Sequence, residues 1–187
     1  MSQALNLRNH FLIAMPALED PNFFHTVTYV CEHNSEGALG IVINRPTDIT
    51  LGELLAQLSI TAEPQIDTTR NVFEGGPVQQ EQGFLLHSPL GRWSASLPIT
   101  EQIALTSSKD ILEAIANGAG PERYLLTLGY AGWGPGQLEE EMVANAWLSG
   151  PASAEILFDT PAEQRWEAAA ALLGVDLRLL SSDSGHA

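Results

Sequence analysis

The sequence predicts one α/β domain with a mixed, largely antiparallel central sheet flanked by helices. Three observations predict it. Short apolar runs of strand length recur along the chain, and segments of helical composition with clear start signals lie between them. Strands and helices alternate irregularly, which favours antiparallel pairing over regular βαβ units. The 187 residues suffice for one substantial core, and no repeat or linker divides them.

Runs rich in β-branched and aromatic residues are expected to form the sheet. They cover residues 11–15, 26–32, 38–44, 72–74, 83–87, 92–97, 103–106 and 124–128. The turn sequence 34–37 joins the second and third runs, which predicts an antiparallel hairpin. The neighbouring short runs after residue 72 predict meander-like antiparallel pairing, and residues 175–180 can add a strand or a packed tail.

Helix start signals mark the segments that should cover this sheet. Helices are expected from Asp20-Pro21 for about one turn, after Thr50, over 110–116, over 137–144, and from Pro161 to Leu173. Thr50 followed by Glu53 is a capping box. Ser107 or Ser108 can cap the helix over 110–116. Each helix should place its apolar face on the sheet.

The stretch from residue 123 to 148 organises the rest of the chain. An apolar run ends at Leu128, Gly129–Gly136 holds four glycines in eight residues, and helix-forming residues follow. This pattern predicts strand, glycine-rich turn and helix. The turn either brings backbone amides to a bound anion or forms a tight structural connection that folds Trp133 onto the sheet. The acidic run Glu139–Glu141 already supplies negative charge to the first helical turn, which favours the structural alternative.

The charge balance restricts the classes of partner. Eight basic against 23 acidic residues give a formal net charge of −15, which disfavours direct contact with nucleic acid and with anionic membranes. The single cysteine, Cys31, lies in an apolar run and is expected to be a packed, inert thiol in a reducing compartment. The apolar segment 11–18 is too short to span a bilayer. A cytoplasmic protein is expected, with loosely held ends over about residues 1–10 and 181–187.

Four sequence motifs together resemble one bacterial family. They are DP-x-F from Asp20, VINRP ending at Pro46, GGPV from Gly75, and LGYAGW-x-x-GQLE from Leu128. The chain is similar to the AlgH/YqgE family over nearly its whole length. The resemblance implies a mixed central sheet with a smaller β-containing portion. It implies no agreed catalytic residues and no assigned activity, and one member's link to transcriptional control of alginate production does not establish contact with DNA.

The motif residues at turns are the candidates for a binding site, because binding residues concentrate in loops. Arg45 can hold an anionic group while Asn44 orients it, or it can pair with a nearby carboxylate. If the loops at Gly75-Gly76 and Gly129–Gly136 face one cleft, they border a pocket; otherwise they are two unrelated turns. The candidate ligand-binding residues are Asn44, Arg45, Gly75, Gly76, Gly129, Tyr130, Gly132, Trp133 and Gln137.

No catalytic constellation is evident. His33 and His87 lie at the ends of apolar strands, where each could act as a general base or serve as a structural hydrogen-bonding residue. Neither has metal-ligand spacing to a partner, so no metal and no cofactor is expected. Ser107-Ser108-Lys109 fits a helix cap better than a serine–lysine pair, and no nucleophile-elbow motif is present.

Three function hypotheses follow. The first is a cytoplasmic, non-enzymatic module that binds a small molecule or a protein partner in the cleft bordered by these motifs and has an indirect regulatory role. The second is an enzyme acting on a small acidic or polar substrate, with His33 or His87 as base. The third, a transcription regulator that contacts DNA, is disfavoured by the net charge. The sequence leaves the oligomeric state open.

Overall fold

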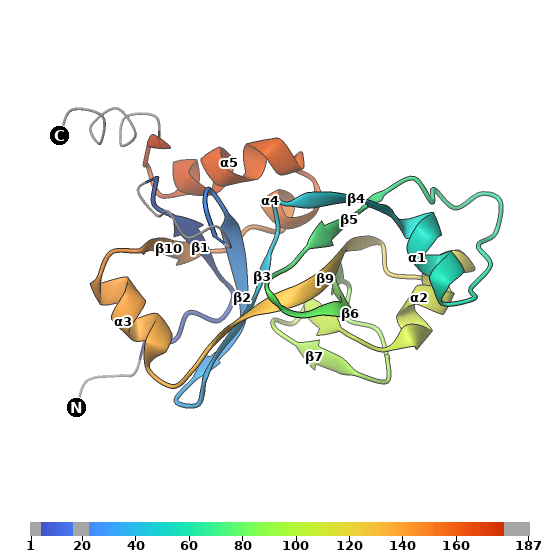
Figure 1. Cartoon of the computed structure of the whole chain (residues 1–187), viewed down its shortest axis with the longest axis horizontal. Helices are drawn as coiled ribbons and strands as arrows, with labels where there is room; N and C mark the ends of the chain where they lie inside the picture. Colours follow the sequence, from blue (N-terminus) through green and yellow to red (C-terminus); the bar gives the residue numbers. More distant parts are fainter. Residues whose placement is uncertain (1–4, 17–22, 178–187) are drawn as a thin grey trace.

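A computed structural model of the chain describes residues 5–16 and 23–177. The described elements are β1 (His10–Ala14), β2 (Val27–Asn34), β3 (Gly37–Val42), β4 (Pro46–Thr50), α1 (Leu51–Gln57), β5 (Asn71–Glu74), β6 (Val78–Ser88), β7 (Ser96–Pro98), β8 (Ala104–Thr106), α2 (Lys109–Ala116), β9 (Arg123–Trp133), α3 (Gln137–Val143), β10 (Trp147–Pro151), α4 (Ala154–Phe158), a 3₁₀ turn η1 (Ala162–Gln164) and α5 (Arg165–Leu172). The α/β class with a largely antiparallel sheet is therefore confirmed (Figure 1).

Strand β9 connects the two halves of the sheet. The main path runs β10-β1-β2-β3-β9-β6-β8-β7, and β4 and β5 form a branch. Up to Leu128, β9 pairs antiparallel with β6 and parallel with β5; Tyr130 still pairs with Val78 of β6, and from Ala131 onward β9 pairs antiparallel with β3. Gly129 has φ 78°, a left-handed conformation that glycine adopts without strain. The strand thus passes through the first glycines instead of ending at Leu128 as predicted, and only residues 134–136 form the turn.

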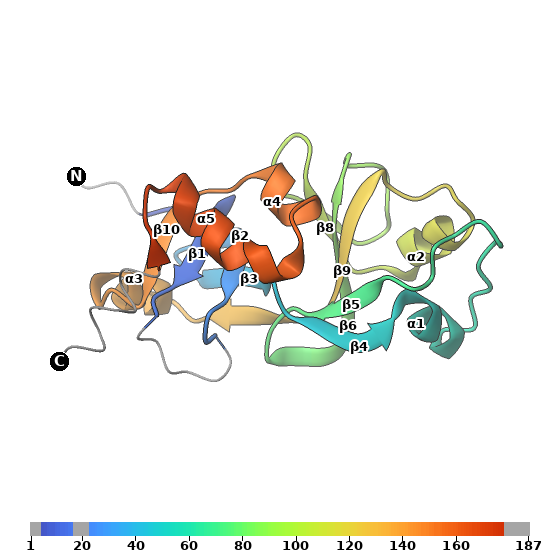
Figure 2. The same ribbon diagram turned by 90° about the horizontal axis from the view of Figure 1, so that it is seen from above.

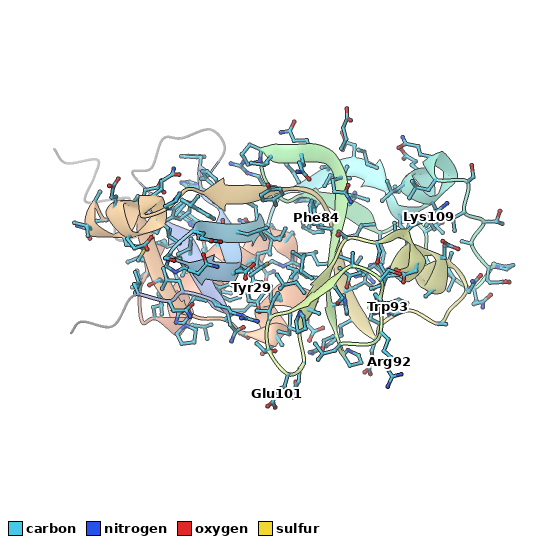
Figure 3. All side chains as sticks on the ribbon, turned by 90° about the horizontal axis from the view of Figure 1, so that it is seen from below. Tyr29, Phe84, Arg92, Trp93, Glu101 and Lys109 are labelled. Atoms are coloured by element: carbon cyan, nitrogen blue, oxygen red, sulfur yellow. The ribbon has the colours of Figure 1, made fainter. Side chains whose placement is uncertain are left out.

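Helices cover both faces of this sheet. α4 and α5 pack over β1, β2 and β3 on one face, α3 covers the opposite face of that half, and α1 and α2 cover the far half (Figures 1 and 2). One buried cluster extends under α4 and α5 across both halves and includes Tyr29 and Phe84 (Figure 3). This cluster therefore spans both halves of the sheet, and two smaller clusters lie under α1 and α2 and under α3.

Several local predictions are confirmed. β2 and β3 form the antiparallel hairpin across the turn 34–37. The side chain of Thr50 accepts a hydrogen bond from the Glu53 amide at 3.2 Å, which is the expected cap of α1. β7 and β8 pair antiparallel, as the meander prediction required, although β7 begins only at Ser96. Leu7 is buried, so the segment over residues 1–10 that was expected to be loosely held includes one residue that packs into the core.

Other predictions were wrong in detail. β4 and β10 were not predicted, because their prolines indicated turns; Pro46 begins β4 and Pro151 ends β10, positions where a strand tolerates proline. β6 begins at Val78, ahead of the predicted 83–87. Ser108 precedes α2, but its hydroxyl makes no capping bond to the helix. The predicted helix start at Asp20-Pro21 and residues after 177 lie outside the described residues.

Candidate functional site

The three motif segments chosen from the sequence meet in space, through main-chain hydrogen bonds. The Gly75 amide donates to the Leu128 carbonyl on β9 at 2.8 Å, and the Gly75 carbonyl accepts from the Val42 amide at 2.8 Å. The Glu74 amide donates to the Arg45 carbonyl at 2.8 Å. The end of β3, the start of β4, the end of β5 and the middle of β9 are thereby joined.

The motif glycines allow backbone to touch backbone at this junction. A Cβ atom on Gly76 would overlap the carbonyl group of Tyr130, and one on Gly129 would overlap the carbonyl oxygen of Gly76. Gly75 approaches the Gly129 carbonyl equally closely. Side chains cannot be accommodated at these positions, so the glycines serve the close contact between the β5–β6 turn and β9.

Asn44 and Arg45 hold the segment that enters β2. The Asn44 side-chain oxygen accepts from the Val27 amide at 2.9 Å, and its amide nitrogen donates to the His25 carbonyl at 2.9 Å. Arg45 donates through Nη2 to the Phe24 carbonyl at 3.1 Å. Both side chains therefore position the backbone of residues 24–27.

Trp133 and Gln137 belong to a cluster built around Glu141, a residue that the sequence analysis did not select. Glu141 Oε1 accepts from the indole nitrogens of Trp133 at 3.1 Å and Trp147 at 2.9 Å. Gln137 donates to Glu141 Oε2 at 3.0 Å and accepts from the Gly134 amide at 3.0 Å. The sequence did hold a signal for this cluster, because Gln137 and Glu141 are four residues apart on one predicted helix and such side chains lie next to each other.

The other two members of the LGYAGW motif differ in exposure. The Tyr130 ring meets Phe84 edge-on, with ring centroids 5.6 Å apart, and belongs to the core under α4 and α5. Gly132 is exposed, and a Cβ there would meet the Tyr130 ring at 3.4 Å. Neither residue lines the pocket described below.

The two candidate histidines are buried and their ring nitrogens face protein groups. His33 Nδ1 accepts from the Leu7 amide at 3.0 Å, and its Nε2 lies 3.3 Å from Glu139 Oε1. His87 Nδ1 lies 2.9 Å from the Pro89 carbonyl oxygen and Nε2 lies 2.7 Å from Thr106 Oγ1. Because a carbonyl only accepts, Nδ1 of His87 carries the proton. Burial lowers the pKa of His87, and the hydrogen bond to Pro89 opposes that change.

A pocket lined by arginines lies beside the motif junction, between β5, the start of β9 and α5. Its volume is about 320 Å³, within the usual size range of small-molecule sites. Twelve residues line it: Pro46, Leu51, Arg70, Asn71, Phe73, Tyr124, Leu125, Leu126, Phe158, Ala162, Glu163 and Arg165. Pro46 is the last residue of the VINRP motif, so the motif borders this pocket from one side.

Arg165 is the fixed charge of the pocket. Its side chain is 5% exposed, Nε donates to the Thr160 carbonyl at 2.8 Å, and Nη1 donates to the Ile43 carbonyl. These two bonds fix the orientation of the guanidinium plane. Burial lowers the pKa of Arg165 to about 10, with Glu163 raising it and Arg70 lowering it, so the group stays protonated at neutral pH.

Aromatic rings support the arginines around the pocket. The Arg70 guanidinium lies 4.1 Å from the centre of the Tyr124 ring, and that of Arg165 lies 5.1 Å from Phe73. Arg70 also donates to the Tyr124 carbonyl at 3.1 Å. Such stacking restrains long side chains in one orientation. Glu163 is the acidic residue of the lining, so two arginines outweigh one carboxylate in a chain of formal charge −15.

Sequence reasoning did not select Arg70, Phe73, Tyr124 or Arg165. Arg165 looks like an ordinary helix residue in an alanine-rich segment. Its contact with Ile43 spans 122 residues of sequence, and no local pattern reports such a contact. The available signal was only the scarcity of basic residues, which makes each arginine of this chain worth considering.

Comparison with known proteins identifies the family. A family model described as AlgH-like matches residues 11–178. This chain belongs to the AlgH-like family. A UPF0301 protein of Thioalkalivibrio sulfidiphilus is 58% identical over 187 residues, covering 100% of both chains. A UPF0301 protein of Nitrosococcus oceani is 57% identical over 180 residues, covering 96% of each.

Two solved structures share the AlgH-like fold. The solution structure of the AlgH protein from Pseudomonas aeruginosa superposes with a TM-score of 0.81 at 50% identity and covers 97% of each chain. A crystal structure of a Corynebacterium diphtheriae protein gives a TM-score of 0.72 at 19% identity, covering 97% of this chain and 94% of the other, which shows the fold alone. The family resemblance expected from the motifs is thus confirmed.

Cys31 is packed inside the core. Burial raises the pKa of the Cys31 thiol, and the side chain is fully enclosed, as a packed thiol would be. Within residues 5–16 and 23–177, no helix is long and apolar enough to cross a membrane, and no group of three or more His, Cys, Asp or Glu side chains could hold a metal ion.

Proposed function

We propose that this protein is a non-enzymatic binding module for a small anionic ligand, a carboxylate or phosphate compound, and that the ligand occupies the arginine-lined pocket. The observation that carries the proposal is the buried Arg165 guanidinium, fixed by two carbonyls in a 320 Å³ cavity that also contains Arg70. A charge held in place before binding requires little ordering when the anion arrives. We further propose that the protein acts in the cytoplasm and that its regulatory role is indirect.

The arrangement favours an anion that has a flat or apolar portion. Phe73 and Phe158 line the pocket together with the two arginines, so a charged group and an apolar group are recognised side by side. The guanidinium fork matches the oxygen spacing of both carboxylate and phosphate. Phenyl phosphate combines these properties and is a suitable probe.

Binding is preferred to catalysis because of the positions of the histidines. His33 and His87 are buried among protein partners, and neither lines the arginine pocket. A general base must reach the proton that it removes, either directly or through one water molecule. The enzyme hypothesis therefore gains no support from this site.

Titration of the ¹⁵N-labelled protein with phenyl phosphate tests the proposal. Amide signals of Asn71, Phe73 and Tyr124 are expected to shift together in a saturable manner. Arg70→Gln should weaken binding about 5-fold or more, because it removes one charge from the pocket while leaving the buried Arg165 in place. Arg92→Gln is the matched control, since Arg92 is exposed and points away from the molecule (Figure 3). Equal affinity of the two variants, or shifts without saturation, would refute the proposal.

A further inference from the structure

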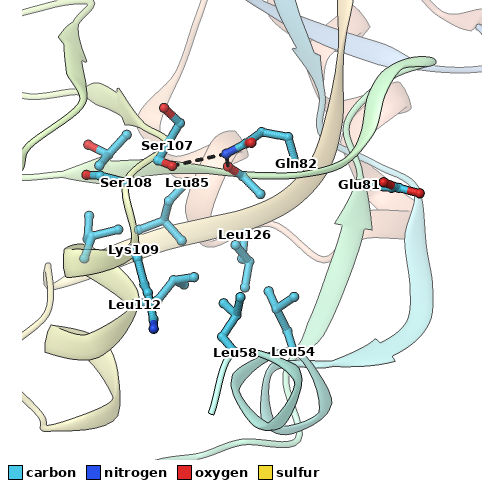
Figure 4. Close-up of a pocket in the computed structure, with 13 residues that line it drawn as sticks. Leu54, Leu58, Glu81, Gln82, Leu85, Ser107, Ser108, Lys109, Leu112 and Leu126 are labelled. Carbon is cyan, nitrogen blue, oxygen red and sulfur yellow. Dashed lines mark hydrogen bonds between the residues drawn. The ribbon is translucent and has the colours of Figure 1, made fainter. Parts of the chain in front are cut away.

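A second pocket, of different chemistry, lies between α1 and α2. Its volume is about 190 Å³, and its wall is aliphatic. The apolar lining residues are Leu54, Leu58, Leu85, Ile111, Leu112 and Leu126. The polar lining residues are Glu81, Gln82, Thr106, Ser107, Ser108 and Lys109, and Figure 4 shows Gln82 and Ser107 on one side of the opening and the Lys109 side chain beside Leu112. No residue is shared with the arginine pocket except Leu126.

Gly83 keeps this pocket open. It lies within strand β6 and lines the pocket, and a Cβ atom placed on it would meet nothing within 4 Å. Glycine weakens a strand interior, so it is usually found where backbone or a ligand approaches closely. At Gly83 no protein atom makes that approach, in contrast to Gly76 and Gly129. The space above Gly83 is therefore available to a ligand.

Lys109 provides the charge at the opening. It is the only lysine of the chain, it is exposed, and within the described residues no carboxylate forms an ion pair with it. The neighbouring Asp110 is already engaged, because its oxygens accept from Ser108 at 2.5 Å and from the Ser94 amide at 2.9 Å. Glu81 borders the opening on the side away from Lys109 (Figure 4).

The side-chain amide of Gln82 is hydrogen-bonded to protein groups beside the opening. Its nitrogen donates to the Ser107 carbonyl at 3.2 Å and to the Gly83 carbonyl at 3.3 Å (Figure 4). The ammonium group of Lys109 is the cation among the residues that line this pocket. An aliphatic cavity with a cation at its opening is complementary to an alkyl chain that ends in an anionic group.

We propose that this pocket binds a short aliphatic carboxylate, with its alkyl chain between α1 and α2 and its carboxylate beside Lys109. A volume of 190 Å³ holds about six groups of the size of a water molecule, which is the size of a chain of roughly six carbons. The proposal does not depend on the arginine pocket, and either site can fail without the other.

Hexanoate and 1-hexanol are the probes. Their binding is measured by NMR from the methyl signals of the leucines that line the pocket. Affinity should rise about 4-fold for each methylene from butanoate to hexanoate, because each added group leaves water. Hexanoate should bind about 1.5- to 5-fold more tightly than hexanol, the difference expected for an exposed ion pair. Equal binding of the acid and the alcohol would overturn the assignment of the carboxylate to Lys109.

The only lysine also offers a direct probe. Reductive methylation with ¹³C-formaldehyde keeps the charge of the ammonium group and labels one side chain, that of Lys109, besides the chain's amino terminus. Its signal should move on addition of hexanoate and stay in place on addition of hexanol. If hexanoate shifted the leucine methyl signals but not the ¹³C-methyl signal of Lys109, the proposed orientation of the ligand would be contradicted.

Two substitutions separate the contributions of chain and charge. Gly83→Val fills the open space and should reduce hexanoate binding at least about 10-fold without lowering the melting temperature, since valine suits a strand. Lys109→Gln should weaken hexanoate up to about 5-fold and leave hexanol unchanged, while Arg92→Gln changes neither. Undiminished hexanoate binding by a folded Gly83→Val protein would overturn the proposal. Phenyl phosphate binding by that variant should match the parent, which keeps this test separate from that of the arginine pocket.

Discussion

Gly129 lies so close to Gly76 that a Cβ atom on Gly129 would overlap the carbonyl oxygen of Gly76. The two glycines come from motifs more than fifty residues apart in the sequence, and they meet without any side chain between them. The turn after β5 is thereby seated on β9 where that strand passes from one half of the sheet to the other. The arginine pocket borders the same junction through Pro46 and Phe73.

Gly129→Ala should destabilise the fold by about 3 kcal/mol or more, because it combines left-handed strain with overlap in a packed region. Gly136→Ala is the matched control. Gly136 has φ 75°, close to the 78° of Gly129, but a Cβ there meets nothing within 4 Å, so its cost should be about 1 kcal/mol. Urea unfolding measures both. Similar losses in the two variants would mean that Gly129 is needed for its backbone conformation alone.

The features that the sequence predicted well are those encoded locally. The hairpin over residues 27–42 and the capping box at Thr50 depend on neighbouring residues, so their signals could be read directly. β4 and β10 were missed because their pairing partners are remote. Pro46 pairs with Phe73 and Trp147 pairs with Ala14, and the proline that begins β4 and the one that ends β10 each resemble a turn signal.

In the candidate site too, the features encoded locally were predicted and those that depend on remote contacts were not. The motif glycines were expected to approach something closely, and the structure shows that they approach one another. The arginine pocket depends on contacts such as that of Arg165 with the Ile43 carbonyl, which only the folded chain brings together. Composition indicates that basic residues are scarce, but it does not indicate which of them share a cavity.

Glu141→Gln should cost about 1–3 kcal/mol, because one carboxylate accepts the indole N–H groups of both Trp133 and Trp147 and its replacement by a neutral amide weakens both bonds. Tryptophan fluorescence should change as well, since two of the four tryptophans contact this group. Glu140→Gln, an exposed change of equal charge on the same helix, should cost less than about 0.5 kcal/mol. If the two variants unfolded at the same urea concentration, the Glu141 cluster would contribute nothing to stability.

The burial of His87 predicts a specific pH dependence of stability. Its pKa is lowered in the folded protein, first because of burial, so on acidification the unfolded chain takes up the proton earlier, near pH 6.5. The stabilising contribution is therefore complete above about pH 6.5 and is lost as the pH falls from there towards the folded-state pKa, at no more than about 1.4 kcal/mol per pH unit. Urea unfolding between about pH 7.5 and 5.5 should show this slope, and His87→Gln should reduce it, with a remainder from His25, whose pKa is also lowered by burial. A ring-proton NMR titration with a midpoint at or above 6.5 for His87 would contradict the prediction.

The charge distribution predicts that the protein does not form a specific complex with duplex DNA at physiological salt. The chain has a formal charge of −15 and only eight basic residues, so few cations are available to displace counterions from DNA phosphates. Fluorescence anisotropy with labelled duplex should show no saturable binding at about 150 mM salt, and any weak signal at about 20 mM salt should disappear as salt is added. Saturable, sequence-dependent binding at the higher salt concentration would require a basic surface that the net charge conceals. In that case direct DNA contact would replace the indirect regulatory role proposed for this protein.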